Sequence, residues 1–102
     1  MSQKSLAKGA ARLPEVKRLH ALINEIAKPK SVRGYELHFG DDATGDAAVW
    51  VYFLLEPDRR SSDDDIEELT DLRFRVSDSI LKKGGLDRIP YVNFREIPSK
   101  AA

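Results

Sequence analysis

The segment 47–55, Ala-Ala-Val-Trp-Val-Tyr-Phe-Leu-Leu, is apolar or aromatic at every position and is bounded by the turn-forming residues Asp46 and Pro57. A continuous apolar run of this length is typical of a strand that is covered on both faces, whereas a half-buried strand alternates apolar and polar residues. We therefore expect a central strand here. In a chain of 102 residues, a small sheet with helices on one face leaves its other face bare. Whatever covers that second face is therefore the best clue to function.

Four further elements follow from the spacing of apolar residues. Three- and four-residue steps predict helices over about 14–27 and from the Ser62–Asp64 capping residues to the Gly84-Gly85 stop. Alternation predicts strands over 33–40 and 91–97. The apolar stripe of the second helix consists of Ile66, Leu69, Leu72, Val76 and Ile80.

This element order predicts the α+β class. The expected architecture is a two-layer αββαβ sandwich, ferredoxin-like or KH-like, with a three-stranded mixed sheet and two helices on one face. We place 47–55 in the middle of the sheet, and the KH-like order with 33–40 in the middle is the alternative. The single domain spans 13–98, with a flexible basic tail over 1–12 and a disordered C-terminus over 99–102.

Side chains of a strand point alternately to its two faces, which assigns each residue of the sheet. The helix side receives Tyr35, Leu37, Phe39, Val49, Val51, Phe53, Leu55, Val92 and Phe94. The open face receives Glu36, His38, Trp50, Tyr52, Leu54, Tyr91, Asn93 and Arg95.

Aromatic residues and arginine are enriched where proteins make their strongest contacts. We expect a homodimer or a partner protein to dock on the open face, and we place Trp50 in the simple core as the alternative. The contact residues would be Trp50, Tyr52, Tyr91 and Arg95, with Phe74 and Leu81, which lie off the helix stripe, as a second candidate patch.

An RNA-binding module is the alternative function. The net charge is zero, but residues 1–34 carry eight Lys and Arg against two acids, and residues 35–102 carry nine against fifteen. The basic part can neutralise phosphates while the aromatic face stacks bases. The candidate residues are Lys4, Lys8, Arg12, Lys17, Arg18, Lys28, Lys30 and Arg33.

The motif content disfavours catalysis, so we expect a non-enzymatic protein without a cofactor. Cysteine is absent, and neither a phosphate-cradling loop nor a nucleophile motif occurs. A metal site formed by His38 with Glu36 and Glu96 is a third hypothesis. Without cysteines, a signal-peptide segment or an apolar run long enough to span a bilayer, the sequence predicts a cytoplasmic protein that does not enter the membrane.

Two family resemblances accompany this interpretation. Residues 31–97 resemble, in element order, the cytoplasmic domain of cation diffusion facilitators, and the stretch 32–39 is similar to its first strand. That resemblance implies dimerisation and places the family's metal-binding histidine at His38, although the second helix of this chain has no histidine. The stretch 90–94 is similar to the last strand of ribosome-binding factor A, whose KH-like domain contacts ribosomal RNA. This chain lacks the large excess of basic residues of that family.

Overall fold

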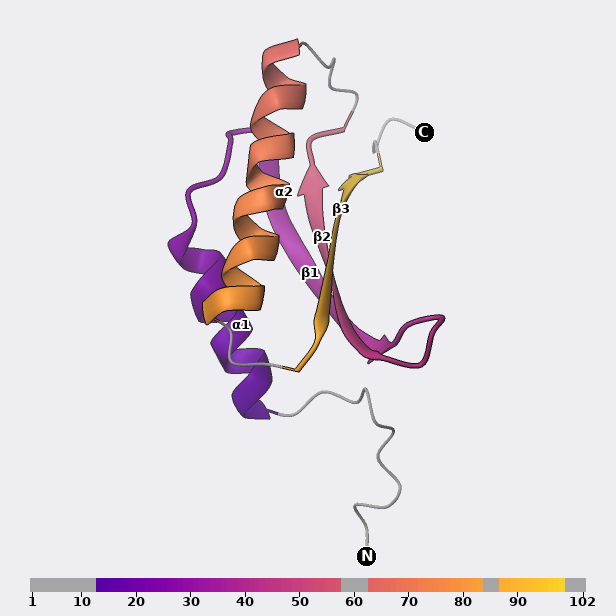
Figure 1. Cartoon of the computed structure of the whole chain (residues 1–102). Coiled ribbons are helices and arrows are strands. Elements are labelled where there is room, and N and C mark those ends of the chain that lie inside the picture. The colour runs from indigo at the N-terminus through magenta and orange to yellow at the C-terminus, as the bar shows by residue number, and fades with distance from the viewer. Residues whose placement is uncertain (1–12, 58–62, 84–86, 99–102) are drawn as a thin grey trace, which may run out of the picture.

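The computed structural model of the chain describes residues 13–57, 63–83 and 87–98. Its elements are α1 (Leu13–Glu25), β1 (Val32–Asp41), β2 (Ala47–Leu55), α2 (Asp63–Lys83) and β3 (Ile89–Glu96). Both helices lie on the same side of the twisted sheet (Figure 1). The predicted two-layer αββαβ sandwich of the α+β class is therefore confirmed.

The sheet has the order β1-β2-β3, with β2 in the middle. β1 and β2 form an antiparallel hairpin, and β3 runs parallel to β2 after the α2 crossover. The central position predicted for 47–55 is confirmed, and the KH-like order with the first strand in the middle is wrong for this chain. The apolar character of β2 explains this strand order. An edge strand uses charged and polar residues to avoid pairing with other chains, whereas a central strand has neighbours on both sides and does not need them.

Two element boundaries differ by two residues from the sequence prediction, and the other boundaries of α1, β1 and β3 differ by one. α1 ends at Glu25 rather than near 27, because the backbone N–H of Ile26 bonds to the carbonyl of Ile23 in a tighter final turn. β3 begins at Ile89 and includes Pro90. A proline is tolerated here because β3 is an edge strand with one side free of ladder hydrogen bonds. The predicted tails over 1–12 and 99–102, the Ser62 cap and the Gly84-Gly85 stop lie outside the described residues.

The core lies between the helices and the sheet. Its buried residues are Leu19, Ile23, Val49, Val51, Phe53, Leu72, Val76, Ile80 and Val92, with Tyr35, Leu37, Phe39 and Phe94 packed against them. This set matches the helix side predicted from strand alternation. Leu55, also predicted there, is buried as well.

The predicted apolar stripe of α2 is wrong at its first position. Ile66 is 55% exposed, whereas Leu72, Val76 and Ile80 are buried. Figure 1 shows the reason, because the first turns of α2 extend beyond the ends of β2 and β3 and have no sheet beneath them. Within the described residues, neither helix has the length and hydropathy needed to cross a membrane.

Candidate interface on the open sheet face

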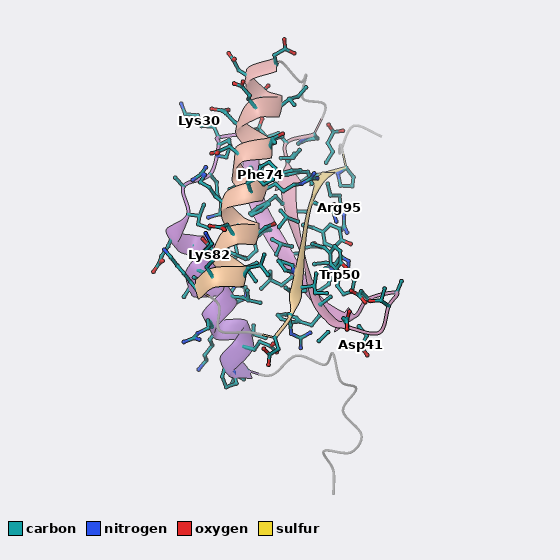
Figure 2. The ribbon with its side chains drawn as sticks, in the orientation of Figure 1. Lys30, Asp41, Trp50, Phe74, Lys82 and Arg95 are labelled. Carbon is teal, nitrogen blue, oxygen red and sulfur yellow. The ribbon has the colours of Figure 1, made fainter. Side chains whose placement is uncertain are left out.

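The face of the sheet opposite the helices has the composition that alternation predicts. Along β2, Val49, Val51 and Phe53 are fully buried toward the helices, while the intervening side chains are half-buried on the other side. Figure 2 shows Trp50 and Arg95 on this side, away from α1 and α2. The open face consists of four cross-strand rows: Gly40, Ala48 and Ile89; His38, Trp50 and Tyr91; Glu36, Tyr52 and Asn93; and Gly34, Leu54 and Arg95.

Trp50 lies on a platform built from all three strands. Its ring stacks on Tyr91 of β3, with 5.6 Å between ring centroids and 18° between planes. On the other side it lies over Gly40 of β1, where the Cβ of any larger residue would lie 3.6 Å from Trp50 Cζ3. Trp50 is therefore half-buried by its own sheet, and Tyr91 stays 37% exposed beside it. The simple-core alternative for Trp50 does not describe this position.

Arg95 reaches across the sheet from β3 to β1. Its guanidinium lies 4.6 Å from the centre of the Tyr52 ring, and Nη1 is 3.2 Å from Glu36 Oε1. His38 Nε2 lies 3.4 Å from the same oxygen, and the His38 ring meets Tyr52 edge-on at 5.3 Å. One carboxylate thus faces two basic side chains over one aromatic ring. About half of each side chain remains exposed, so the solvated pair contributes little to stability.

The turn between β1 and β2 organises a second carboxylate. Asp42 Oδ1 accepts hydrogen bonds from the backbone N–H groups of Thr44 and Asp46 and from the Thr44 hydroxyl, at 2.7–3.0 Å. Oδ2 accepts one from the Tyr91 hydroxyl at 2.9 Å. These bonds, above all that from the Thr44 hydroxyl, lower the pKa of Asp42 to about 2. The hydrogen bond between Tyr91 and Asp42 raises the pKa of Tyr91 and connects the turn to the aromatic platform.

The three metal-ligand candidates are not brought together. His38 and Glu36 are neighbours on the open face, but Glu96 pairs with Leu55 and alternates with Arg95, which places it on the helix side. Among residues 13–57, 63–83 and 87–98, no group of three or more potential ligands is close enough to hold a metal ion. The structure therefore does not assemble the ligand set considered from the sequence.

The chain has no match among protein-family models, curated proteins or solved structures. The resemblances to cation diffusion facilitators and to ribosome-binding factor A stay predictions.

The basic residues proposed for RNA binding are not gathered on the open face. Lys17 and Arg18 lie on α1, and Lys30 lies in the loop that follows it; all three are exposed. Lys28 is half-buried, and its ammonium donates to the carbonyls of Ile23 and Ile26 at 2.6 and 2.8 Å. Burial lowers the pKa of Lys28. Arg33 pairs with Glu56 at 3.7 Å, while Lys4, Lys8 and Arg12 lie outside the described residues.

Phe74 and Leu81, the second candidate patch, lie on the helix layer. They are 68% and 66% exposed, and their seven-residue spacing places them on one side of α2. Figure 2 shows Phe74 on α2, on the opposite side of the sheet from the open face. The two patches are therefore separate surfaces.

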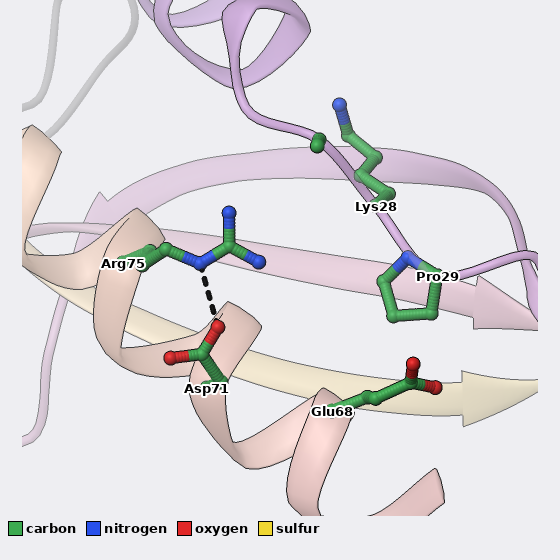
Figure 3. Close-up of a pocket in the computed structure, with 6 residues that line it drawn as sticks. Lys28, Pro29, Glu68, Asp71 and Arg75 are labelled. Atoms are coloured by element: carbon green, nitrogen blue, oxygen red, sulfur yellow. Dashed lines mark hydrogen bonds and ion pairs between the residues drawn. The ribbon is translucent and has the colours of Figure 1, made fainter.

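A pocket that the sequence did not indicate lies between α2 and the loop after α1. It has a volume of about 280 Å³ and is lined by Ala27, Lys28, Pro29, Glu68, Asp71 and Arg75 (Figure 3). Arg75 Nε donates to Asp71 Oδ2 at 2.8 Å, and Lys28 caps the end of α1, so these charged groups already have partners. Its residues come from segments about 40 positions apart, which no local pattern connects.

Proposed function

We propose that this chain is a non-enzymatic binding module that docks on protein, either a second copy or a different protein, through its open sheet face. The observation that carries the proposal is the contiguous group of Trp50, Tyr52 and Tyr91 on a face that neither described helix covers. An apolar patch of this kind is typical of a contact surface, and aromatic side chains contribute strongly to such contacts.

The charges of the open face favour protein over RNA. Among the open-face residues, Arg95 is the one permanent cation, and it already pairs with the carboxylate of Glu36. A base-stacking platform works together with a positively charged groove that follows the phosphates, and this face has no net positive charge to offer. Lys28, one of the residues proposed to contact RNA, already donates from its ammonium to carbonyls at the C-terminal end of α1.

The exposure of the polar groups favours binding over catalysis. Glu36, His38 and Arg95 are about half exposed on a sheet surface. Catalytic groups usually lie in a cleft that holds the substrate and excludes water, which strengthens their electrostatic interactions with it. A face of exposed, mutually paired charges around aromatic rings instead has the composition of an interface that is polar at its rim.

Sedimentation velocity over a dilution series tests the proposal with two variants. Trp50→Ala removes the largest contact side chain of the open face, and Phe74→Ala removes an exposed ring of similar type on α2. We expect the wild-type chain and Phe74→Ala to associate alike, and Trp50→Ala to associate at least about tenfold more weakly while keeping its circular dichroism spectrum.

Two results would contradict the proposal. Association that persists in Trp50→Ala would place the contact elsewhere, and unfolding of Trp50→Ala would give that side chain a purely structural role. RNA binding at low salt that Trp50→Ala abolishes would favour the RNA alternative, so a filter-binding salt series accompanies the sedimentation.

A further inference from the structure

The outer edge of β1 is a long strand edge without the usual protection against pairing. In the described part of the chain, no strand lies beyond β1, which forms one margin of the sheet. β1 has ten residues and contains neither proline nor lysine, which commonly block such an edge, whereas β3 at the other margin includes Pro90. The one irregularity of β1 lies between Val32 and Gly34. From Gly34 onward, β1 is a regular strand that can add a neighbour.

The backbone groups of Tyr35, Leu37 and Phe39 point toward this outer edge. The N–H of Asp42 donates to the carbonyl of Asp46 at 2.8 Å, and the register between β1 and β2 continues from that pair through the regular part of β1. In an antiparallel ladder every second pair is hydrogen-bonded. The three residues therefore fall between the bonded pairs, and their N–H and C=O groups are directed away from β2, where they can bond to another strand.

The sequence of β1 is complementary to itself about Leu37. In an antiparallel pair of β1 strands centred on this residue, each position faces the one equally far on the other side of the centre. Glu36 of one copy then faces His38 of the other on the open face, so an acid lies opposite a base. Tyr35 faces Phe39, and Leu37 faces its own equivalent, on the helix side. The residues whose backbone groups point outward also face one another.

The neighbouring registers lack this match. An antiparallel pair centred on Glu36 places two carboxylates directly opposite each other, which is destabilising. A pair centred on His38 places the ring of Tyr35 opposite the carboxylate of Asp41. The pattern of charged and apolar residues therefore selects Leu37 as the centre.

Glu36 has one carboxylate oxygen left for a second copy. Arg95 Nη1 at 3.2 Å and His38 Nε2 at 3.4 Å, both of the same chain, approach Oε1. Within the described residues Oε2 has no partner, and 44% of the Glu36 side chain is exposed. His38 of a second copy can therefore approach this carboxylate while Arg95 stays in place.

We propose that β1 pairs with β1 of a second copy of this chain, antiparallel and centred on Leu37, and joins two three-stranded sheets into one continuous sheet. Opposite residues of paired strands point to the same side, so the twofold axis is perpendicular to the sheet and both open faces lie on one side of the dimer. This contact is separate from the open face and goes beyond the proposed function. Association through the open face is then a further step, between such dimers or with another protein.

Cysteine cross-linking tests the register, because the chain has no cysteine of its own. Glu36→Cys and His38→Cys, mixed together, place two thiols on facing residues that are not hydrogen-bonded to each other, about 4.5 Å apart at Cα, which suits a disulfide. Each variant alone places its two cysteines diagonally, about 7–8 Å apart, which is too far. We expect the mixture to form a covalent dimer at least about tenfold faster than either variant alone.

A change of charge tests the affinity. His38→Glu places a carboxylate opposite Glu36 of the second copy on both sides of the axis, so we expect dimerisation to be about tenfold weaker in sedimentation velocity. Asn93→Glu adds the same charge to the same face on β3 and should dimerise as wild type does. Circular dichroism and urea unfolding check that the variants fold. Asp78→Cys, exposed on α2, gives the rate of cross-linking by random collision.

Three results would overturn the inference: a monomeric wild-type chain, His38→Glu that dimerises as tightly as wild type, or a cysteine mixture that cross-links no faster than its single variants. Trp50→Ala separates the inference from the proposed function. In its presence the cross-link should form as before, and only the further association through the open face should weaken. If Trp50→Ala instead leaves a monomer and the cysteine mixture does not cross-link, the proposed function stands and the edge pairing is wrong.

Discussion

Arg88 and Glu15 form a buried ion pair across 73 positions of the chain. The Arg88 side chain is 4% exposed and that of Glu15 is 15% exposed. Two guanidinium nitrogens face the two carboxylate oxygens, Nη1 donates to the carbonyl of Ala48 at 2.8 Å, and the guanidinium carbon lies 5.0 Å from the centre of the Phe39 ring. The pair joins the first turn of α1 to the sheet just before β3 begins.

Removing one partner of this pair should strongly destabilise the fold. Glu15→Ala leaves the Arg88 guanidinium buried without its carboxylate, so we expect the free energy of unfolding to fall by about 3–5 kcal/mol. Urea denaturation measures it. Glu25→Ala, at the exposed end of α1, is the control and should change stability by less than about 0.5 kcal/mol. Equal effects of the two variants would show that the buried pair has no special role.

Acid should weaken the wild-type fold through Asp42. Its pKa falls from 3.8 to about 2 on folding, so the ionised carboxylate contributes stability above pH 3.8, and this contribution is lost as the pH falls toward 2. Asp42→Asn lacks the titrating group, so its stability should decline less steeply over this window. Urea unfolding at a series of pH values compares the two slopes, and parallel curves would contradict the assignment.

The pKa of Asp42 should respond unequally to its hydrogen-bond donors. The Thr44 hydroxyl is the largest cause of the lowered value, and the Tyr91 hydroxyl contributes less. Thr44→Val should therefore raise the pKa of Asp42 more than Tyr91→Phe does. Carbon-detected NMR titration of the Asp42 carboxyl resolves the order directly, and a larger effect of Tyr91→Phe would reverse it.

Lys28 should matter for the stability of the fold although neighbouring Lys30 does not. The Lys28 ammonium donates to two carbonyls at the end of α1, those of Ile23 and Ile26, where the last carbonyls of a helix lack intrahelical partners. We expect Lys28→Met to lower the free energy of unfolding by about 1 kcal/mol, discounted for its partial exposure. Lys30→Met alters an exposed side chain and should be close to neutral. Thermal unfolding of both variants gives the comparison.

Two apolar positions of α2 should differ sharply although they belong to the same sequence stripe. Leu72 is fully buried and Ile66 is 55% exposed. Leu72→Ala should destabilise by about 2–5 kcal/mol because it leaves a cavity in the core. Ile66→Ser should change stability by less than about 0.5 kcal/mol. Urea unfolding measures the free energy of unfolding of the two variants. If Ile66→Ser lowered it as much as Leu72→Ala does, the first turn of α2 would be packed more tightly than its exposure indicates.

Much of the candidate interface follows from the sequence. The uniform apolar run placed 47–55 at the centre of the sheet, and alternation assigned Trp50, Tyr52, Tyr91 and Arg95 to one face. These inferences work because a strand turns its side chains to opposite sides at every step, so a face can be read from neighbouring positions. The helical periodicity of α2 failed at Ile66, since it records which side of a helix is apolar and not where the sheet beneath the helix ends.

The sequence by itself determined the element order, the central strand and the composition of each sheet face, because these depend on patterns spanning a few residues. Only the tertiary structure decided that Arg88 is buried against Glu15 and that Arg95 meets Glu36, 59 positions away. It also separated Glu96 from His38 on opposite faces. These relationships depend on strand register and on the docking of α1, which bring distant residues within a few ångströms and leave no local pattern in the chain.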